Sequence, residues 1–195
     1  MDERYKVLVV DDDLEMCGLI SDVLKGEGLS STSISDSLEA SKILKKEEFD
    51  VIITDLKMKG LKGLDLLEEA KQVSPLTPVI IITAFGTIES AIQAMKIGAY
   101  DYITKPFQTE ELLLTVKKAL ETRLLKKEVI RLRKEVESRY DFHRLIGRSP
   151  AMQKIYDLIE RIRDSSINVL ITGESGTGKE LAAKAIHYSG IRKEG

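Results

Sequence analysis

Short runs of apolar, mostly β-branched residues recur through the first hundred positions of the chain. The clearest lie at residues 6–10, 50–54 and 78–83, where almost every position is apolar. Such uninterrupted runs are typical of strands that are buried on both faces of a sheet. With weaker strand patterns at residues 29–34 and 100–103, the sequence predicts five strands.

Amphipathic segments separate these strands. In the segments that contain Ile20 and Ile92, apolar residues recur every three or four positions, as along one face of a helix. Asp36 opens a capping box at the start of a second helix, and Gly63 precedes the apolar stripe of a third. The regular alternation of strand and helix predicts a doubly wound α/β domain with one parallel sheet over residues 1–120.

The pattern changes after this domain. From Thr109 the sequence predicts one long, highly charged helix that contains no Gly or Pro before Gly147. Over the linker, residues 121–146, its apolar residues repeat at alternating steps of four and three; they are Leu125, Val129, Leu132 and Val136. This is the spacing of a coiled-coil seam of about two heptads, which predicts a homodimer of undetermined orientation. The alternative is a solvated linker helix whose apolar residues pack on the neighbouring domain.

A second unit follows at residues 147–195. It contains an amphipathic helix around Ile155 and Ile159, a strand predicted at residues 167–172, a glycine-rich turn and a helix that starts at Gly178 or Lys179. This stretch is too short to enclose a core around its strand. We therefore expect it to be the truncated first part of a longer α/β domain, and to be fragile.

Composition narrows the functional class. Hydrophobic residues make up 43% and charged residues 32% of the 195 positions, which is typical of a globular chain and not of a disordered or fibrous one. The single cysteine, Cys17, cannot form an internal disulfide, and His143 and His187 have no cysteine partners for a zinc site. No apolar run is long enough to span a membrane. We expect a cytoplasmic protein without a membrane partner.

Charge is distributed unevenly along the chain. Residues 1–116 hold 12 Lys and Arg against 21 Asp and Glu, whereas residues 117–195 hold 18 against 11. The excess of positive charge in the second part is spread along a helix and accompanies no base-reading element. A solvated face is therefore favoured over a nucleic-acid surface.

Polar residues follow the predicted strands at their carboxyl ends. Asp11 and Asp12 follow the first strand, Asp55 follows the third, Thr83 ends the fourth, and Lys105 follows the fifth. Because the carboxyl ends of parallel strands lie along one edge of the sheet, these side chains are predicted to meet. Crowded carboxylates require a cation, and hard oxygen ligands suit Mg²⁺.

Asp55 lies centrally in this group and is a candidate nucleophile for a phosphoryl group. Lys105 would supply a positive charge, and the Thr83 hydroxyl a hydrogen bond, to the transferred group. The alternative is that the aspartates only cap helices and Lys105 is a surface charge. Five such residues at consecutive strand ends favour the functional interpretation.

Four segments at these strand ends resemble the motifs of bacterial response-regulator receiver domains. They are residues 9–13 (VVDDD), 53–58 (ITDLKM), 81–86 (IITAFG) and 102–107 (YITKPF). The resemblance implies a flavodoxin-like strand order of 2-1-3-4-5 and phosphorylation of Asp55 by a sensor histidine kinase. It also implies that Asp11, Asp12, Asp55 and the backbone carbonyl of Lys57 hold Mg²⁺. Further implications are that Lys105 pairs with Asp55, that the peptide before Pro106 is cis, and that Thr83 and Tyr102 move on activation.

The glycine-rich turn lies between an apolar run and a helix, which is the context of a phosphate-binding loop. Its residues are Gly173, Glu174, Ser175, Gly176, Thr177, Gly178, Lys179 and Glu180. Glycines allow backbone N–H groups to surround phosphates, and Lys179 would reach them. Glu180 stands where the general pattern has Ser or Thr. The loop nevertheless resembles, Glu180 included, that of the NtrC-type enhancer-binding activators, which are AAA+ ATPases.

The order of receiver, linker and phosphate-binding loop is similar to the front of an NtrC-family transcriptional activator. This implies a two-component regulator that controls an ATPase acting on RNA polymerase with its alternative sigma factor. ATP is the implied cofactor of the loop, and we expect its binding to be weak or absent in the truncated domain. Contacts to sigma factor and DNA belong to parts that we expect to be missing, so this stretch is expected to be a phosphoacceptor and not an enzyme. The alternatives are a nucleotide-binding ATPase module and a pure dimerisation module.

Overall fold

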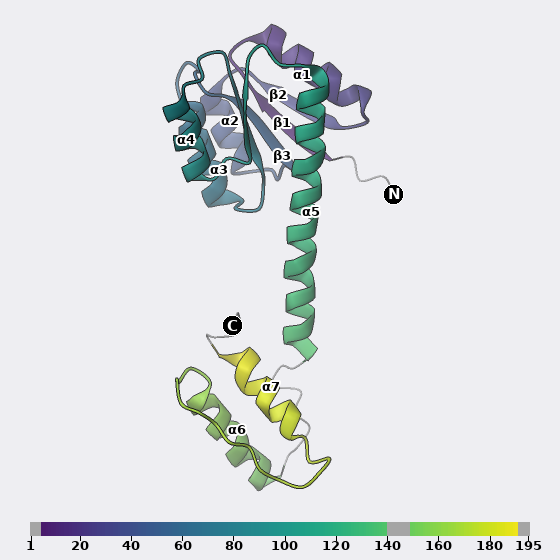
Figure 1. Cartoon of the computed structure of the whole chain (residues 1–195), viewed down its shortest axis with the longest axis vertical. Helices are drawn as coiled ribbons and strands as arrows, with labels where there is room; N and C mark the ends of the chain where they lie inside the picture. Colours follow the sequence, from purple (N-terminus) through teal and green to yellow (C-terminus); the bar gives the residue numbers. More distant parts are fainter. Residues whose placement is uncertain (1–4, 140–148, 191–195) are drawn as a thin grey trace. The chain divides into compact units, whose positions relative to one another are not determined.

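The computed structural model describes residues 5–139 and 149–190 and divides the chain into two compact units, Met1–Lys127 and Glu128–Gly195. In the first unit five strands alternate with five helices (Figure 1). The strands are β1 (Lys6–Val10), β2 (Ser30–Ile34), β3 (Val51–Asp55), β4 (Val79–Thr83) and β5 (Asp101–Thr104). The helices are α1 (Leu14–Gly26), α2 (Ser37–Leu44), α3 (Gly63–Val73), α4 (Ile88–Ile97) and α5 (Thr109–Arg139).

All five strands are parallel and lie in the order β2-β1-β3-β4-β5. The expected doubly wound fold and strand order are thereby confirmed. β3 includes Asp55, which pairs in register with Ile82 of β4. Asp55 is therefore the last residue of its strand, whereas the sequence placed it just after the strand.

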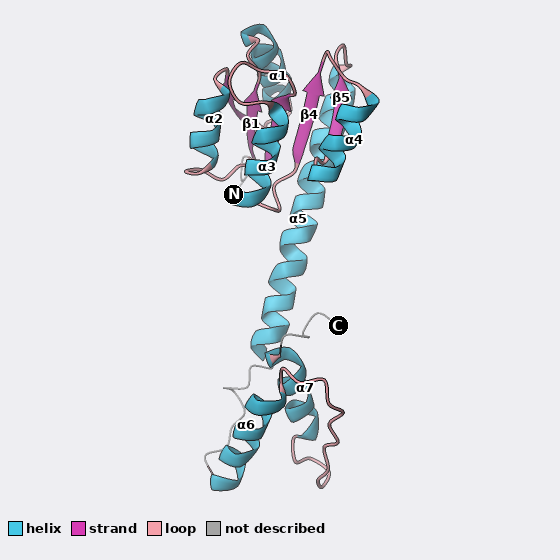
Figure 2. Cartoon of the chain, turned by 90° about the vertical axis from the view of Figure 1, so that its left-hand side faces the viewer, coloured by secondary structure: helices cyan, strands magenta, loops and turns pink. Residues whose placement is uncertain are grey.

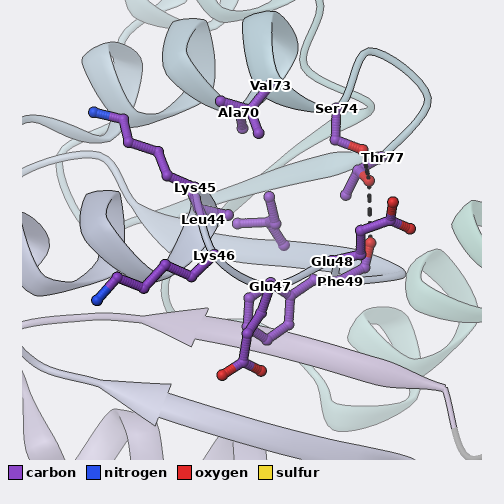
Figure 3. Close-up of a pocket in the computed structure, with 11 residues that line it drawn as sticks. Leu44, Lys45, Lys46, Glu47, Glu48, Phe49, Ala70, Val73, Ser74 and Thr77 are labelled. Carbon is purple, nitrogen blue, oxygen red and sulfur yellow. Dashed lines mark hydrogen bonds between the residues drawn. The ribbon is translucent and has the colours of Figure 1, made fainter.

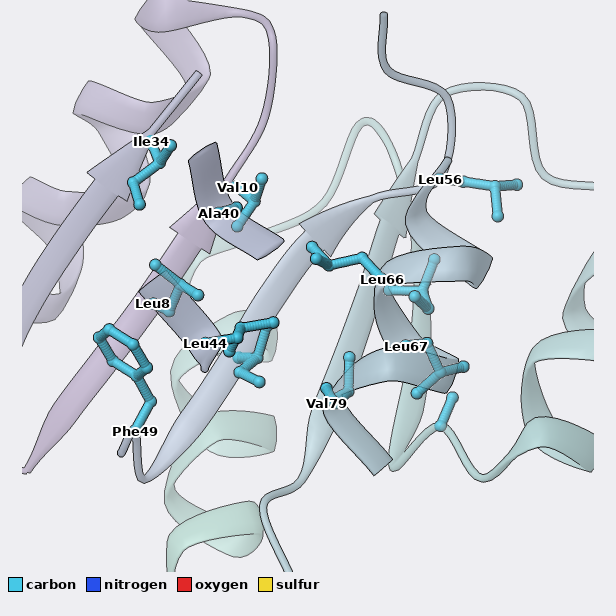
Figure 4. Close-up of a cluster of buried hydrophobic side chains, with 14 of the residues drawn as sticks. Leu8, Val10, Ile34, Ala40, Leu44, Phe49, Leu56, Leu66, Leu67 and Val79 are labelled. Carbon is cyan, nitrogen blue, oxygen red and sulfur yellow. The ribbon is translucent and has the colours of Figure 1, made fainter. Parts of the chain in front are cut away.

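Alternation along each strand separates the core into two layers. Val7 and Val9 of β1 pack beneath α1 and α5, whereas Leu8 and Val10 pack beneath α2, α3 and α4. Figure 2 shows α2, α3 and α4 in front of the sheet, and Figure 4 shows the buried side chains on that face. Because helices cover both faces of the sheet, apolar side chains at successive strand positions are all buried. Each large buried side chain contributes about 1.5–3 kcal/mol to stability.

Local sequence explains where several helices begin. The Asp13 and Asp36 side chains accept hydrogen bonds from the backbone N–H groups of the first turns of α1 and α2, as expected for the N-cap of a helix. The Thr87 hydroxyl does the same for α4, which ends at Gly98 in a left-handed conformation. These caps determine the residue at which each helix begins after the preceding strand.

α5 has a buried first part and an exposed second part. Leu112, Val116 and Ala119 are buried against the sheet. Arg123, one turn beyond Ala119, is only 4% exposed and pairs with Asp50 and Glu48. Packing of α5 on the first unit therefore continues past Leu120, the end that the sequence predicts for this domain. The apolar residues of α5 beyond Arg123 whose burial is described are exposed; they are Leu124, Leu125, Val129, Ile130 and Leu132.

In the second unit the structure describes two helices, α6 (Pro150–Ile162) and α7 (Lys179–Ser189). Ser149 caps α6, and its hydroxyl accepts a hydrogen bond from the Met152 N–H. The strand predicted at residues 167–172 is wrong, because this segment has no regular secondary structure. An apolar run forms a strand only when a neighbouring strand pairs with it, and none does so in the described part of this unit.

Candidate functional site

The central feature of the carboxyl edge is one lysine between two buried carboxylates. The Lys105 Nζ lies 2.6 Å from Asp11 Oδ2 and 3.2 Å from Asp55 Oδ1. Asp11 is 3% and Asp55 7% exposed. Three residues from the ends of β1, β3 and β5 thus form a single ion-paired cluster, as parallel topology predicts.

The backbone holds both carboxylates in place. The Lys57 N–H donates to Asp55 Oδ2 at 2.8 Å, and the Asp13 N–H donates to Asp11 Oδ1 at 3.0 Å. A hydrogen bond from backbone to a carboxylate is charge-assisted and fixes its rotamer. The oxygens of Asp11 and Asp55 therefore have defined directions before any ligand arrives.

Burial disfavours the charged forms of both Asp55 and Lys105, whereas their ion pair favours those charged forms. Burial raises the pKa of the Asp55 carboxyl above its usual range, because the Lys57 N–H and the Lys105 ammonium only partly offset its desolvation. Burial also works against the charge of Lys105, but the hydrogen bonds and charges of Asp11 and Asp55 outweigh it and raise the pKa of the ammonium. Lys105 therefore stays charged at neutral pH.

Gly63 determines how closely α3 approaches the site. A Cβ atom at this position would lie 2.1 Å from the Asp55 carbonyl oxygen, and the Gly63 N–H donates to the Leu56 carbonyl at 3.0 Å. Only glycine permits this contact. Sequence reasoning noticed Gly63 as the start of a helix but missed its role behind Asp55, because the contact is between backbones.

Asp12 and Thr83 lie at the same edge but have other partners. Asp12 Oδ2 accepts from the Lys59 N–H at 3.3 Å, and the fully buried Thr83 hydroxyl accepts from the Phe85 N–H at 3.1 Å. Among the residues that the structure describes, no three His, Cys, Asp or Glu side chains are grouped as ligands of one metal ion. The donors are hard carboxylate oxygens, which is the chemistry that Mg²⁺ prefers.

Tyr102 is half-buried on β5 and points toward α4. Its hydroxyl shares a hydrogen bond of 2.8 Å with the Ser90 hydroxyl, and its ring packs beside the core under α4. Gly86 lies close, since a Cβ there would be 3.2 Å from the Tyr102 hydroxyl. Tyr102 thus links β5 to α4. The Lys105–Pro106 peptide is cis, as the resemblance implied.

Two contacts beside the site were missed by sequence reasoning. The Lys57 Nζ lies 4.4 Å from the centre of the Phe85 ring, which joins the loop after β3 to the loop after β4. The Cys17 thiol donates to the Asp11 carbonyl at 3.3 Å. A cation–π pair between residues 28 positions apart has no signature in sequence spacing, because the topology alone brings the two loops together.

The glycine-rich loop is closed on itself. The Lys179 ammonium donates to the carbonyl oxygen of Gly173 at 2.9 Å and to that of Glu174, and the Thr177 hydroxyl donates to the Glu174 carbonyl at 2.8 Å. Gly176 and Gly178 have positive φ, which glycine tolerates best. Glu180 pairs with Lys184 one turn further along α7. Lys179 thus lies at the loop, in contact with the loop's own backbone.

A separate pocket lies at the opposite edge of the sheet, before β3 and β4. It is lined by residues that include Leu44, Phe49, Ile52 and Thr77, and Lys45 and Lys46 extend away from it (Figure 3). It does not contact the acidic cluster, because the two lie at opposite ends of the strands.

No helix in the described segments is long and apolar enough to cross a membrane.

The fold and the paired carboxylates at its carboxyl edge define a receiver domain. The chain belongs to the response regulator receiver domain family, whose model matches residues 7–117. Residues 145–195 match the sigma-54 interaction domain. The two matches follow each other in the order predicted for an NtrC-type regulator.

Named relatives are similar to this chain over nearly its whole length. The transcriptional regulatory protein ZraR of Klebsiella oxytoca is 37% identical over 191 residues, which is 97% of this chain and 42% of that protein. The DNA-binding transcriptional regulator NtrC of Escherichia coli K12 is 38% identical over 185 residues, 95% of this chain and 39% of NtrC. The chain thus spans about two fifths of the length of these curated relatives.

Solved structures agree with this assignment. NtrX from Brucella abortus in complex with ATP is 37% identical with a TM-score of 0.63, over 98% of this chain and 42% of NtrX. The beryllofluoride-activated NtrC4 receiver domain dimer is also 37% identical, with a TM-score of 0.58, over 60% of this chain and 98% of that one. The NtrC-type resemblance seen in the sequence is confirmed.

Proposed function

We propose that this chain is the phosphoacceptor part of a two-component regulator and that Asp55 receives the phosphoryl group from a sensor histidine kinase. One observation carries the proposal: Lys105 lies between the buried carboxylates of Asp11 and Asp55 at the edge where three strands end. Helix-capping aspartates have no need of a shared, buried counter-ion. The match to the receiver family supports the same assignment.

The chemistry follows from the residues at this edge. An ionised Asp55 oxygen attacks phosphorus in line while the donor group leaves, which forms an acyl phosphate. The Lys105 ammonium stabilises negative charge on the transferred group, and the Lys57 N–H holds the second Asp55 oxygen. The Thr83 hydroxyl would then exchange its bond with Phe85 for one to the phosphoryl group, while Tyr102 would leave Ser90 and turn inward.

Mg²⁺ fits the donor set of this edge. Asp11, Asp12, Asp55 and the Lys57 carbonyl would hold it, as hard oxygen ligands do. When bound, the ion neutralises charge on the phosphoryl oxygens. Asp11 pairs with the Lys105 ammonium in this structure, so the Asp11 carboxylate would be shared between this ammonium and the ion.

The test compares the intact mass of the wild type with that of Asp55→Asn after incubation with acetyl phosphate and Mg²⁺. Asp36→Asn is the matched control, because Asp36 is an exposed helix cap. We expect one phosphoryl mass gain in the wild type and in Asp36→Asn, and none in Asp55→Asn. Equal labelling of all three, or of none, would show that Asp55 is not the acceptor.

We further propose that the second part of α5 forms a homodimer with a second copy of the chain. Leu125, Val129 and Leu132 are each more than two fifths exposed, and the side chain of Val136 lies outside the described part of the structure. If these four occupy the inner positions of the heptads, the flanking positions are acidic on one side, at Glu121 and Glu128, and basic on the other, at Lys126 and Arg133.

These flanking charges favour a parallel dimer. In a parallel pair the acidic flank of one helix faces the basic flank of the other, whereas an antiparallel pair places like charges together. Leu132→Cys in the inner seam should therefore cross-link to its own copy under mild oxidation. Lys127→Cys, on the outer face, is the control and should not. Cross-linking of both or neither would reject the parallel seam.

A second candidate function is nucleotide binding at the glycine-rich loop. Lys179 reaches two carbonyl oxygens of the loop, from where its ammonium could turn to a phosphate. We propose that ATP hydrolysis, control of RNA polymerase through sigma-54, DNA binding and a cytoplasmic location belong to the whole protein. Titration with ATP and Mg²⁺, with Lys179→Ala as control, measures what this stretch retains; binding unaffected by the variant would place the nucleotide elsewhere.

A further inference from the structure

The Ser37 hydroxyl is a buried polar group that its own helix does not require. Ser37 is the first residue of α2 and is fully buried. The cap of α2 is supplied by Asp36, whose side chain accepts hydrogen bonds from the first turn. A buried hydroxyl needs partners, because leaving it unpaired costs free energy. Ser37 finds its partners outside α2, at residues 59–61.

The hydroxyl bridges two backbone groups of the loop between β3 and α3. It donates to the Lys59 carbonyl oxygen at 2.9 Å and accepts from the Leu61 N–H at 2.8 Å. Gly60, between these two residues, has a positive φ of 89°, and a Cβ atom there would lie 3.0 Å from the Ser37 oxygen. A side chain at this position would therefore strain the backbone and crowd the hydroxyl. The bridge depends on both Ser37 and Gly60.

The same loop forms part of the acidic edge. The Lys57 N–H donates to Asp55 at 2.8 Å, and the Lys59 N–H donates to Asp12 at 3.3 Å. Lys59 thus contacts Asp12 through its N–H and Ser37 through its carbonyl oxygen. Its backbone connects a hydroxyl of α2 to a carboxylate of the edge.

Few other contacts hold the middle of this loop. Within the described residues, the hydrogen bonds from the backbone of residues 58–61 to the rest of the domain go to Asp12 and Ser37. The Asp12 carboxylate is exposed, and it is one of the groups proposed to hold Mg²⁺, so its partners would change when the ion binds. Ser37 is the anchor that remains.

We propose that Ser37 is a positioning residue for the divalent cation at the acidic edge. Its hydroxyl holds the loop in one conformation, so that the Lys57 carbonyl oxygen and the Asp12 carboxylate are available to Mg²⁺ with little further loss of conformational entropy. Groups that support metal ligands from behind contribute to metal affinity in this way. The proposal rests on the proposed Mg²⁺ site, and it concerns affinity for the ion and not transfer of the phosphoryl group.

Two variants disrupt the bridge from opposite sides. Ser37→Ala deletes the hydroxyl and leaves the Asp36 cap of α2 in place. Gly60→Ala keeps the hydroxyl but places a Cβ atom against it. Because Gly60 is exposed, this second variant tests the bridge even if Ser37→Ala fails to fold.

Thr77→Val is the matched control. Thr77 is also buried, and its hydroxyl also joins distant segments, since it donates to the Phe49 carbonyl at 3.0 Å. It lines the pocket at the opposite edge of the sheet. Thr77→Val therefore removes a comparable buried hydrogen bond without touching the acidic edge. Urea unfolding of every variant measures its stability.

The experiment measures Mg²⁺ affinity directly. Mg²⁺ is added to the ¹⁵N-labelled full chain without a phosphodonor, and the dissociation constant is obtained from the amide shifts of residues 11–13 and 55–59. We expect the constant to rise roughly tenfold in Ser37→Ala and in Gly60→Ala, and to stay within about twofold of the wild type in Thr77→Val. At saturating Mg²⁺, phosphoryl mass gain from acetyl phosphate should proceed within about twofold of the wild-type rate in all three.

The outcomes separate this proposal from the role of Asp55. A wild-type Mg²⁺ affinity in either folded bridge variant, or an equal loss in Thr77→Val, would overturn the role of Ser37 alone. A slow reaction of Ser37→Ala that persists at saturating Mg²⁺ would do the same, because the hydroxyl would then act on the transfer. Mg²⁺-dependent shifts without phosphoryl mass gain in the wild type would instead overturn Asp55 as the acceptor. Absence of these shifts in the wild type would overturn the Mg²⁺ site and the role of Ser37 with it.

Discussion

Two apolar segments, each followed by a loop of a candidate site, differ in what lies beside them. β4 has β3 on one side and β5 on the other, and helices cover both of its faces. Residues 167–172 have a similar composition, but the described elements of their unit are helices α6 and α7. Ile81 of β4 is fully buried, whereas Leu170 is 88% exposed. Neighbouring strands, and not composition, decide which apolar run becomes a strand.

The same contrast applies to the two loops. The residues after β4 and β5 are held by strands that pair in register, and Lys105 reaches both of its carboxylates. Among the described residues, the Lys179 ammonium donates hydrogen bonds only to the backbone of its own loop. The first site is thus preorganised by long-range contacts, and the second by local ones.

The largest expected effect tests the comparison directly. Ile81→Ala removes a buried side chain from the middle of the sheet and should lower the free energy of unfolding by about 3–4 kcal/mol. Leu170→Ala should change it by less than about 0.5 kcal/mol, because its side chain is already exposed. Urea denaturation followed by circular dichroism measures both. A loss at Leu170 comparable to that at Ile81 would mean that residues 167–172 are packed.

A second test sharpens the view of how tightly the first unit is built. Gly63→Ala places a Cβ against the Asp55 carbonyl and should cost about 2–3 kcal/mol of unfolding free energy. Gly18→Ala in α1, where no atom lies within 4 Å of the added Cβ, should stabilise the protein by about 0.5–1 kcal/mol. Equal effects in chemical denaturation would show that α3 can move away from β3.

A third test concerns where the first unit ends along α5. Arg123→Met keeps apolar packing but removes the ion pair with Asp50. It should lower the free energy of unfolding by about 1–3 kcal/mol. The loss is limited to this range because the Asp50 carboxylate still accepts a hydrogen bond from the Lys6 N–H. Arg131→Met, on the exposed part of the same helix, should leave the urea midpoint unchanged. If the two variants behave alike, Arg123 does not hold α5 to the sheet.

The smallest expected effect concerns Asp55, because burial destabilises its charged form. Because the pKa of Asp55 is raised, the native state binds its proton more tightly than the unfolded state does. The contribution of Asp55 to the free energy of unfolding therefore falls as pH rises from the unfolded-state pKa through the raised native pKa. Without Mg²⁺, Asp55→Asn should be more stable than the wild type at pH 7, by up to about 1 kcal/mol. The advantage should shrink toward pH 4 in urea titrations; an advantage that grows with acidity would contradict the assignment.

The sequence by itself determined the five strands, the helices between them and the residues at the carboxyl edge. It could do so because uninterrupted apolar runs and helical spacing are local signals, and because parallel topology brings Asp11, Asp55 and Lys105 to one edge. It also placed the glycine-rich loop before α7. These are properties of residue type and order along the chain.

Only the tertiary structure decided how these parts contact one another. It placed Lys105 between two carboxylates, turned the Asp12 side chain to the Lys59 N–H, and buried Arg123 against Asp50. It also left residues 167–172 without a strand. Contacts between residues far apart in the chain, and the presence or absence of a pairing strand, depend on which elements become neighbours, and no local pattern encodes that.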